Sequence, residues 1–526
     1  MNDATPVRAL PDHRSQNWTI RKPGARGTGG MVVSQSSVAA GVGADVLRAG
    51  GNAADAAVAT AFAVGVVEPW NSGLGGIGHA LVHQAGAAEA EHCDFGPVAP
   101  AGLDPAAFKL TGRIKTDLFA WPEVEGDTNI HGPLSVVANT APAGYVSLHK
   151  RFGRMPLAEL IQPAVGLARR GLPADWFAAL KIASAAKDLR RYSESARIYL
   201  PDGLPPAPPY VGAPTALVQG RLADTLEAIG REGTDVLYRG AIAAGIVGDI
   251  RDAGGLLARS DLEAVEPAWR TALAIPHRRA LVQAATGLTA GPTLARVLAL
   301  LADAPVAAAP DGAWYAALAR AMRTAYAERL SGKGAGAPMA THTTHLTAAD
   351  KDGMMVALTT TLLSSFGSRL VLPSSGILMN NGVMWFDPRP GAPNGMAGGK
   401  RPLTNMCPII VLRDGRPVLA AGASGGRRIL ASVVQMMSFV LDFGMAPEDA
   451  AHQPRIDVSD PDAVTADPRL PGPVLAALSA ENPVKLAEHT VLPVNYACPN
   501  LILRHDDGTL AGISDAMIPW SAAIAA

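Results

Sequence analysis

The sequence has few cysteines. Only Cys93, Cys407 and Cys498 occur among 526 residues, an odd number with no short paired spacing. Disulfide-dependent domains and zinc sites built from closely spaced cysteines need more than this. We therefore expect neither a disulfide framework nor a zinc site, and we interpret each cysteine as a small core residue.

The sequence also lacks a charge imbalance and a long apolar run. Lys and Arg number 45 against 46 Asp and Glu, a formal net charge of −1. This balance disfavours nucleic acids and anionic membranes as partners and favours a small-molecule substrate. The most apolar stretch, 53–67, contains Asp55 and is shorter than the roughly 20 residues that cross a bilayer, so it predicts a buried helix. The polar first residues show no export pattern, and the expected location is the cytoplasm.

What the chain does have is 48% apolar residues, enough for a sizeable core. Helical periodicity runs from about Ser37 to the Gly50-Gly51 stop, through 53–67, and over most of 142–329. A glycine-dense turn at 71–78 precedes a predicted strand, which is typical of close backbone packing more than of phosphate binding. The small, structure-poor stretch Ser331–Ala340 is the best candidate linker. Strand patterns dominate after it, and an α+β fold follows.

The stretch THTTHLTAADKDGMMVALTTTL, residues 341–362, predicts a hairpin. Asp350–Gly353 is a turn signal between two runs rich in threonine and valine. A turn centred there places Thr343 opposite Thr360 or Thr361. Such a threonine, preceded by a linker, suits a strategy in which the chain is cut before it and the freed α-amine serves its own hydroxyl as base.

Two observations bear on whether these threonines are catalytic. No G-x-S-x-G elbow supplies another nucleophile. Threonine is nevertheless common in strands, so a purely structural reading stays open at this level. His342 and His345 have no metal-ligand set around them, and a structural hydrogen-bonding role is the simpler interpretation.

Separated segments resemble the γ-glutamyltranspeptidase family of N-terminal-nucleophile hydrolases. The resemblance begins at GGMVVSQSSVAAGVGADVLRAGGNAADAAVATAFAVGVVEPWNSGLGGIGHALV. It continues through Thr343-Thr344-His345, TTTLLSSFGS, SSGILMNN, GKRPLTNMCPIIV and GASGGRRI, and it covers nearly the whole chain.

The resemblance implies a four-layer αββα sandwich of the N-terminal-nucleophile type, with no cofactor and no metal. Self-cleavage between His342 and Thr343 would give fragments 1–342 and 343–526 that share one intertwined domain. The fragments would form an α/β heterodimer, and a dimer of such pairs is left open. The family's nucleophile matches Thr343, its supporting hydroxyl matches Thr361, and its oxyanion-hole glycines match Gly425 and Gly426.

The departures from the family concern the residues that grip a γ-glutamyl group. The family's Asp-Phe-Arg-Glu stretch reads Asp94-Phe95-Gly96-Pro97 here, so its arginine is absent. Its Asn-Asn-Gln-Met-Asp-Asp stretch reads NNGVMW over 380–385, its asparagine two residues after the second threonine is Leu363, and its paired serines are Thr404 and Asn405. Each lost charge-assisted hydrogen bond weakens binding by about 1.5–3 kcal/mol. We therefore expect amide cleavage with a non-γ-glutamyl acyl group.

Six residues are candidates for binding that acyl group. Aromatic and apolar side chains often line small-molecule sites, and arginine suits a carboxylate. The candidates are Trp385, Thr404, Asn405, Asn381, Arg369 and Arg427. Core packing or a solvated surface position is the alternative for several of them, and for Met384 core packing is preferred.

The expected function is a self-processing amidohydrolase acting through a Thr343 acyl-enzyme on a small-molecule amide. One alternative is a genuine γ-glutamyl hydrolase or transferase that uses glutathione with rebuilt binding residues. Another is a catalytically silent scaffold, which the retained Thr343, Thr361 and glycine pair disfavour.

Overall fold

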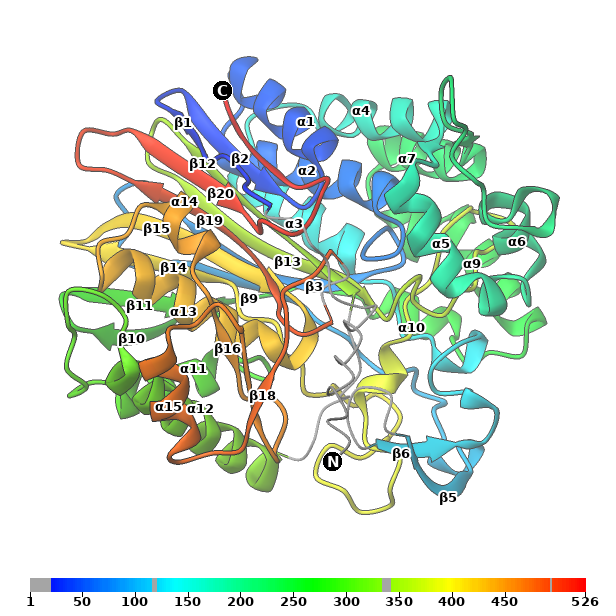
Figure 1. Ribbon diagram of the computed structural model, residues 1–526. Helices are drawn as coiled ribbons and strands as arrows, with labels where there is room; N and C mark the ends of the chain where they lie inside the picture. The colour runs from blue at the N-terminus through cyan, green and yellow to red at the C-terminus, as the bar shows by residue number, and fades with distance from the viewer. Residues whose placement is uncertain (1–19, 116–120, 334–341, 492–493) are drawn as a thin grey trace, which may run out of the picture.

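The structure is a computed structural model that describes residues 20–115, 121–333, 342–491 and 494–526. At its centre two seven-stranded sheets lie face to face (Figure 1). In spatial order, sheet A is β1 (Ala25–Gly27), β20 (Leu510–Ser514), β19 (Cys498–Arg504), β15 (Arg416–Ser424), β14 (Ile409–Arg413), β11 (Ala280–Ala284) and β10 (Leu273–His277). Sheet B is β21 (Ala522–Ala525), β2 (Gly30–Ser34), β12 (His342–Asp350), β13 (Met355–Leu363), β3 (Ile77–His83), β4 (Glu91–Phe95) and β9 (Ala268–Thr271). All their pairings are antiparallel.

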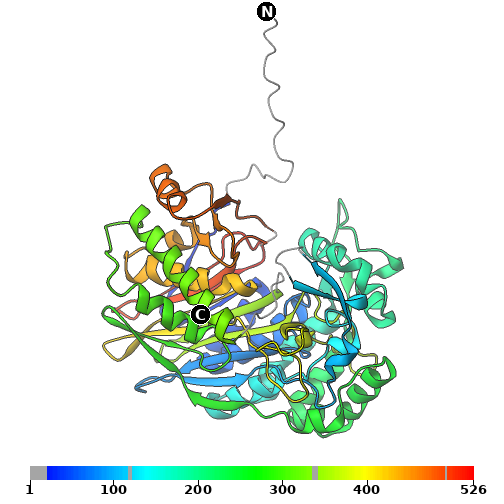
Figure 2. The ribbon, with the colours of Figure 1, turned by 90° about the horizontal axis from the view of Figure 1, so that it is seen from below.

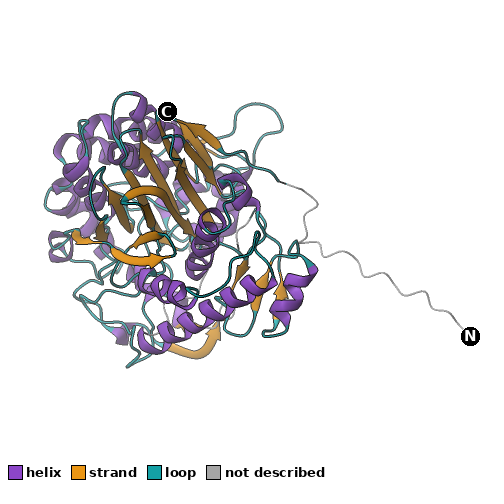
Figure 3. Cartoon of the chain, turned by 90° about the vertical axis from the view of Figure 1, so that its left-hand side faces the viewer, coloured by secondary structure: helices purple, strands orange, loops and turns teal. Residues whose placement is uncertain are grey.

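Helices cover the outer face of each sheet, because alternate strand residues point away from the sheet interface. Sheet B is covered by α1 (Ser37–Arg48), α2 (Ala53–Val67), α3 (Ala141–Phe152) and α4 (Leu157–Arg170). Sheet A is covered by α11 (Gly291–Leu300), α12 (Gly312–Lys333), α13 (Ile429–Leu441), α14 (Pro447–His452) and α15 (Gly472–Ser479). Figure 3 shows the strands enclosed by helices, so the expected four-layer αββα sandwich is confirmed.

Three apolar clusters hold the layers together. Val32, Leu346 and Leu358 pack with α2 in the outer core of sheet B. A second cluster joins sheet A to α11–α13, and a third, which includes Met355 and Ile502, lies between the two sheets. Strands from before and after residue 342 are intermixed in both sheets, so the expectation of helices first and strands second was wrong for β1, β2, β4 and β9–β11. Strand β3 is the one predicted after the glycine-dense turn.

The middle of the chain forms a helical lobe beside sheet B, seen in cyan and green on the right of Figure 2. It contains α5 (Trp176–Leu189), α6 (Ser193–Tyr199), α7 (Gly220–Glu232), α8 (Asp235–Tyr238), α9 (Ala241–Asp252) and α10 (Arg259–Glu263). The remaining strands form small sheets: β5 (Leu110–Lys115) with β6 (Trp121–Val124), β7 (Leu172–Pro173) with β8 (Ala216–Leu217), and β16 (Ile456–Asp457) with β17 (Val464–Ala466) and β18 (Val484–Leu486).

Local predictions held in the first hundred residues. Helix α1 ends at Arg48 before Gly50, whose φ of +94° suits glycine. The buried Asp55 is explained by a capping box with Asn52 at the start of α2. The glycine-rich turn packs tightly as expected, since a Cβ on Gly75 would lie 2.0 Å from the Leu378 carbonyl oxygen.

The linker prediction needs correction at one end. Helix α12 continues to Lys333, so the first three residues of Ser331–Ala340 are helical. The rest of that stretch, like the polar first residues of the chain, lies outside the described residues. Of the helices in the described ranges, none combines the length and apolarity that a membrane crossing requires.

Candidate active site

The predicted hairpin forms from β12 and β13. Thr343 pairs with Thr361 and Thr344 pairs with Thr360, as the turn at Asp350–Gly353 required. The regular register breaks between His342 and Thr343, at the bond expected to be cut. A register irregularity at a strand end commonly re-aims a side chain.

Thr361 gathers three hydrogen bonds on one hydroxyl. Its Oγ1 donates to the His342 carbonyl oxygen over 2.8 Å, and accepts from the Thr343 hydroxyl over 3.2 Å and from the Leu363 N–H over 2.8 Å. A hydroxyl has one proton and two lone pairs, so this arrangement satisfies it fully. Thr343 is 3% exposed and Thr361 is fully buried. The scissile carbonyl, the candidate nucleophile and the supporting hydroxyl are thus connected.

The segment behind Thr361 is conformationally strained. Leu363, Phe366 and Arg369 all have positive φ, at 84°, 56° and 64°, a region that L-residues other than Asn and Asp rarely adopt. Asn381 holds the beginning of this segment, because its amide accepts from Ser364 N and its backbone N–H donates to the Leu362 carbonyl. Such strain persists only where surrounding contacts impose it, and it is frequent at functional sites. Here it aims the Leu363 N–H at Thr361.

The two candidate oxyanion glycines directly follow β15. Gly425 and Gly426 have φ of +137° and +63°, and they precede α13 through the short 3-10 helix η6 (Gly426–Arg428). A Cβ on Gly425 would lie 2.7 Å from Ala497, so no side chain fits there without movement. Gly425 and Thr343 line the same cavity, which places the start of η6 beside the candidate nucleophile.

That cavity has a volume of about 180 Å³ and two kinds of wall. The apolar part of the wall is Trp70, Phe177, Val494 and Ile518. The polar part includes four residues that the sequence interpretation did not select, namely Gln35, Glu68, Asn71 and Lys181. Glu68 could have been noticed from the sequence, because it is an acid at the end of an otherwise apolar helix, just before Pro69.

A chain of hydrogen bonds runs along the polar wall. Asn71 Nδ2 donates to Glu68 Oε1 over 3.0 Å and to Gln35 Oε1 over 3.2 Å. Gln35 Nε2 in turn donates to the Ser424 hydroxyl, next to Gly425. The other carboxylate oxygen, Glu68 Oε2, accepts from the Thr344 hydroxyl over 3.1 Å. The residue after the candidate nucleophile is therefore linked to the residue before the glycine pair.

Burial controls the charge states around the cavity. It raises the pKa of Glu68 to about 7, although Asn71, Thr344 and the charge of Lys181 act to lower it. It lowers the pKa of Lys181, whose ammonium lies 5.2 Å from the centre of the Phe177 ring. Burial also lowers the pKa of His342 well below its usual range, with Lys181 contributing in the same direction. His342 is accordingly neutral.

His345 has a structural role. Its Nδ1 lies 2.8 Å from the Thr359 hydroxyl, and its ring packs against Gly422, where a Cβ would lie 2.2 Å from Cε1. Burial lowers the pKa of this imidazole to about 3.

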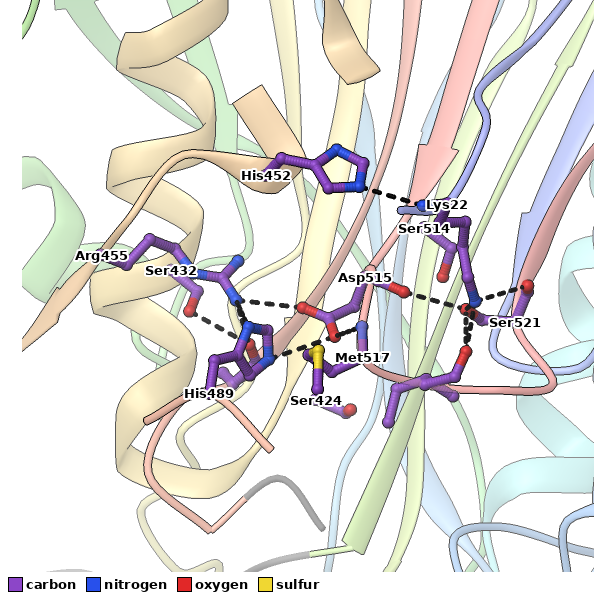
Figure 4. Close-up of polar contacts among 12 residues, drawn as sticks. Lys22, Ser424, Ser432, His452, Arg455, His489, Ser514, Asp515, Met517 and Ser521 are labelled. Carbon is purple, nitrogen blue, oxygen red and sulfur yellow. Dashed lines mark hydrogen bonds and ion pairs between the residues drawn. The ribbon is translucent and has the colours of Figure 1, made fainter. Parts of the chain in front are cut away.

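A buried ion-pair network anchors the segment that closes the apolar wall (Figure 4). Asp515 is fully buried and pairs with Arg455 Nη2 at 3.0 Å and His489 Nε2 at 3.3 Å. The same carboxylate accepts from the Met517 N–H over 2.9 Å, and Lys22 donates to the Ile518 carbonyl oxygen. Because Ile518 lines the cavity, this network fixes part of its wall.

None of the six predicted substrate-binding residues is among the described residues lining the Thr343 cavity. Arg369 Nη1 donates to the carbonyl oxygens of Ile130 and Gly367, and Asn381 holds the strained segment. Trp385 is buried with Met384 in an apolar cluster, so Met384 is a core residue as preferred. Asn381 and Arg369 thus hydrogen-bond within the strained segment, and Trp385 lies in one apolar cluster with Leu363.

The other three candidates lie near the ends of sheet A strands. Thr404 and Asn405 precede β14 and both accept from Arg329, the first through its carbonyl oxygen at 2.5 Å and the second through Oδ1 at 3.5 Å. Arg427 follows the glycine pair, and its carbonyl oxygen accepts from Tyr326.

Thr404 also lines a second cavity of about 200 Å³, together with Asp94, Arg270 and Arg401. Arg270 Nη1 pairs with Asp94 Oδ2 at 2.7 Å, and Arg401 pairs with Oδ1. A Cβ on Gly96 would lie 3.0 Å from Arg401 Nη2. A side chain at position 96 would therefore require the end of the flexible Arg401 side chain to shift.

Comparison with known proteins addresses the family directly. The family model described as gamma-glutamyltranspeptidase matches residues 39–336 and 331–519. The chain belongs to this family. It is accordingly an enzyme of the N-terminal-nucleophile amide hydrolase class, as the resemblance implied.

Relatives named as glutathione hydrolases and relatives named as acylases are both similar to this chain. The glutathione hydrolase proenzyme of Bacillus subtilis (strain 168) is 28% identical, covering 93% of this chain and 90% of the relative. The acylase ACY 1 proenzyme of Pseudomonas sp. (strain SE83) is 31% identical, covering 96% and 95%. The crystal structure of cephalosporin acylase from Bacillus halodurans superimposes with a TM-score of 0.84 at 25% identity, covering 98% and 99%.

Proposed function

We propose that the chain cuts itself between His342 and Thr343, and that the freed Thr343 hydrolyses a small amide whose acyl group is not γ-glutamyl. The observation that carries the proposal is the connected set of Thr343 hydroxyl, Thr361 hydroxyl and His342 carbonyl beside a cavity. The proenzyme names of the two sequence relatives agree with self-cleavage.

The direction of these hydrogen bonds supports a route for self-cleavage. Thr343 Oγ1 attacks the His342 carbonyl carbon and passes its proton to Thr361 Oγ1. Thr361 gives its own proton to the carbonyl oxygen, so the tetrahedral intermediate forms without net charge. The C–N bond then breaks, the intermediate's hydroxyl proton goes to the Thr343 nitrogen, and an ester links His342 to Thr343. Water hydrolyses this ester and leaves a free α-amine on Thr343.

The same hydroxyl would then act on substrate. The α-amine takes the proton of Thr343 Oγ1 as the oxygen attacks the substrate's amide carbonyl. Gly425 lines the cavity and Gly426 follows it, and their amides would receive the negative oxygen that develops. The substrate's amine leaves with the proton that the α-amine of Thr343 had taken, and water then releases the acyl group from Thr343.

The residues around position 96 and Leu363 support a non-γ-glutamyl acyl group. Gly96 carries no side chain to grip a carboxylate, and Arg401 Nη2 lies 3.0 Å from the position that a Cβ on it would take. Leu363, Met384 and Trp385 form an apolar cluster where the family's polar residues would grip an ammonium. Because the family's arginine and aspartate are absent, a γ-glutamyl group would leave two charges short of partners, at a cost of several kcal/mol.

The two fragments would stay together after cleavage. Strands from 1–342 and 343–526 are intermixed within both sheets, so separating the fragments would break two pairings in sheet A and three in sheet B. A heterodimer is the expected processed form, and we keep the cytoplasm as its expected location.

Denaturing gel electrophoresis tests self-cleavage. Wild type is expected to give two fragments divided at residue 343, while Thr343→Ala stays whole. Thr347→Val is the matched control, since Thr347 lies on the same strand and face, two positions beyond His345. It is expected to cleave like wild type. A wild-type chain that stays whole refutes the enzyme and leaves the silent scaffold.

Substrate preference is tested on the processed protein. Glutathione and a γ-glutamyl anilide are compared with simple acyl anilides of the same leaving group, and intact mass of the small fragment reads the acyl group trapped on Thr343. Fast turnover of glutathione would favour the alternative, a γ-glutamyl hydrolase with rebuilt binding residues.

A further inference from the structure

Glu68 occupies an unfavourable position for a carboxylate. It caps the C-terminal end of α2, where the helix dipole is negative, and it is 1% exposed. Its hydrogen bonds come from two neutral donors, Asn71 Nδ2 and the Thr344 hydroxyl. The charge of Lys181 in the same cavity acts on Glu68, but among the described residues no cation donates a hydrogen bond to it. A buried carboxylate without such a partner is destabilised, and a positive charge that contacts it offsets this.

Self-cleavage would create such a charge beside it. Before cleavage the Thr343 nitrogen is a neutral amide, and afterwards it is an amine that becomes an ammonium whenever it takes a proton. Thr344, the next residue, already contacts Glu68 Oε2 at 3.1 Å, and Thr343 and Glu68 line one cavity. The new cation therefore appears in the cavity that holds this carboxylate.

We propose that Glu68 is the positioning residue for the α-amine of Thr343, an inference that rests on the proposed self-cleavage. Its carboxylate accepts a hydrogen bond from the amine, which turns the nitrogen lone pair toward Thr343 Oγ1. When the amine takes the hydroxyl proton during attack, the same carboxylate balances the ammonium. Glu68 itself neither gives nor takes the reacting proton.

The other ionisable groups that line this cavity come from three elements. Lys181 on α5 repels the ammonium, because it is a cation in the same cavity. His342 at the start of β12 is neutral, as its lowered pKa indicates. Burial raises the pKa of Cys498 on β19 well above its usual range, so the thiol is also neutral. Among the described residues that line the cavity, Glu68 is the one acid.

The α-amine pKa of the processed protein measures this directly. Competitive labelling with acetic anhydride across a range around the ordinary α-amine value of about 8, with mass spectrometry of the peptide beginning at Thr343, gives that pKa without a substrate. Glu68→Gln is expected to lower it by about one unit, because a nearby carboxylate favours the ammonium. Lys181→Met is expected to shift it in the opposite direction, because a like charge is removed.

The variants separate the outcomes. Glu68→Gln must still cleave itself, since the role begins only when the amine exists, and a folded variant that stays whole overturns the inference. An unshifted α-amine pKa in processed Glu68→Gln also overturns it, while self-cleavage stands. If this variant does not fold, Glu68→Asp replaces it: the shorter side chain withdraws the carboxylate and is expected to lower the pKa by less, and no shift again overturns the assignment. An uncleaved wild type overturns the proposed function itself.

Discussion

Replacing Thr361 by valine tests the geometry of self-cleavage most sharply. Valine keeps the β-branched shape, which a central strand favours, and removes only the hydroxyl. Three contacts disappear with it: the 2.8 Å donation to the His342 carbonyl oxygen, the 3.2 Å acceptance from Thr343 and the 2.8 Å acceptance from the Leu363 N–H.

Two magnitudes follow from these contacts. The Leu363 N–H is left buried without its partner, which is expected to lower the free energy of unfolding by about 1–3 kcal/mol. Loss of one donor to the carbonyl under attack is expected to slow self-cleavage by about 10²–10³-fold. The two effects are separable, because the first changes stability and the second changes only the rate.

A time course of fragment formation after synthesis, read on denaturing gels, measures the rate. Urea unfolding of chains kept whole by an added Thr343→Ala, in wild type and variants alike, measures the stability. Thr361→Ser is the matched control, since it keeps the hydroxyl and is expected to cleave within about tenfold of wild type. Cleavage of Thr361→Val at the wild-type rate would refute the role of this hydroxyl. Equal slowing in both variants would assign the effect to packing.

Other perturbations probe the surroundings. Thr347→Val removes a buried hydroxyl that has no partner among the described residues, so thermal unfolding should show unchanged stability or a gain of up to about 1 kcal/mol. Gly425→Ala forces a Cβ to 2.7 Å from Ala497 at a φ of +137°, so a loss above about 2 kcal/mol and a defect in acylation are expected by urea unfolding and intact mass. Asp515→Asn leaves Arg455 buried without its partner charge and should cost about 3–5 kcal/mol in urea unfolding. Burial alone would raise the pKa of Asp515, but His489 and Arg455 outweigh it and hold the pKa well below its usual range. The resulting stabilisation is full above the unfolded-state value of about 3.9 and is lost as pH falls through the folded value, so acid unfolding of Asp515→Asn should lack this component.

The hairpin and its neighbours could be predicted because their determinants are local. The turn Asp350–Gly353 fixes the register of two adjacent strands, and that register alone brings Thr361 to Thr343. The stop of α1 and the start of α2 follow from Gly50 and Asn52 in the same way. When a short loop or a pair of adjacent strands positions a side chain, its place can be predicted without knowing the rest of the molecule.

The cavity could not be predicted because distant segments build it. Gln35, Lys181 and Ile518 come from the end of β2, from α5 and from the segment before β21, and no local pattern links them. The substrate candidates illustrate the same limit. Trp385 and Asn381 occupy sequence positions equivalent to binding residues of the family. Trp385 is nevertheless buried in an apolar cluster, and Asn381 hydrogen-bonds the strained segment. The contacts of such a position depend on neighbours that are distant in the sequence.

The two acids of helix α2 show how far local reasoning reaches even so. Asp55 and Glu68 are both buried in an apolar stretch, and composition alone does not separate them. Asp55 lies in the first turn, where the dipole favours it and the capping box with Asn52 and the Arg154 N–H satisfy its oxygens. Glu68 lies at the other end, where the dipole opposes it and its two bonds come from neutral groups. The helix ends can be predicted from the sequence, but the hydrogen bonds of the structure are needed to distinguish Glu68 as the acid whose position folding does not explain. A function is sought for such a buried charge.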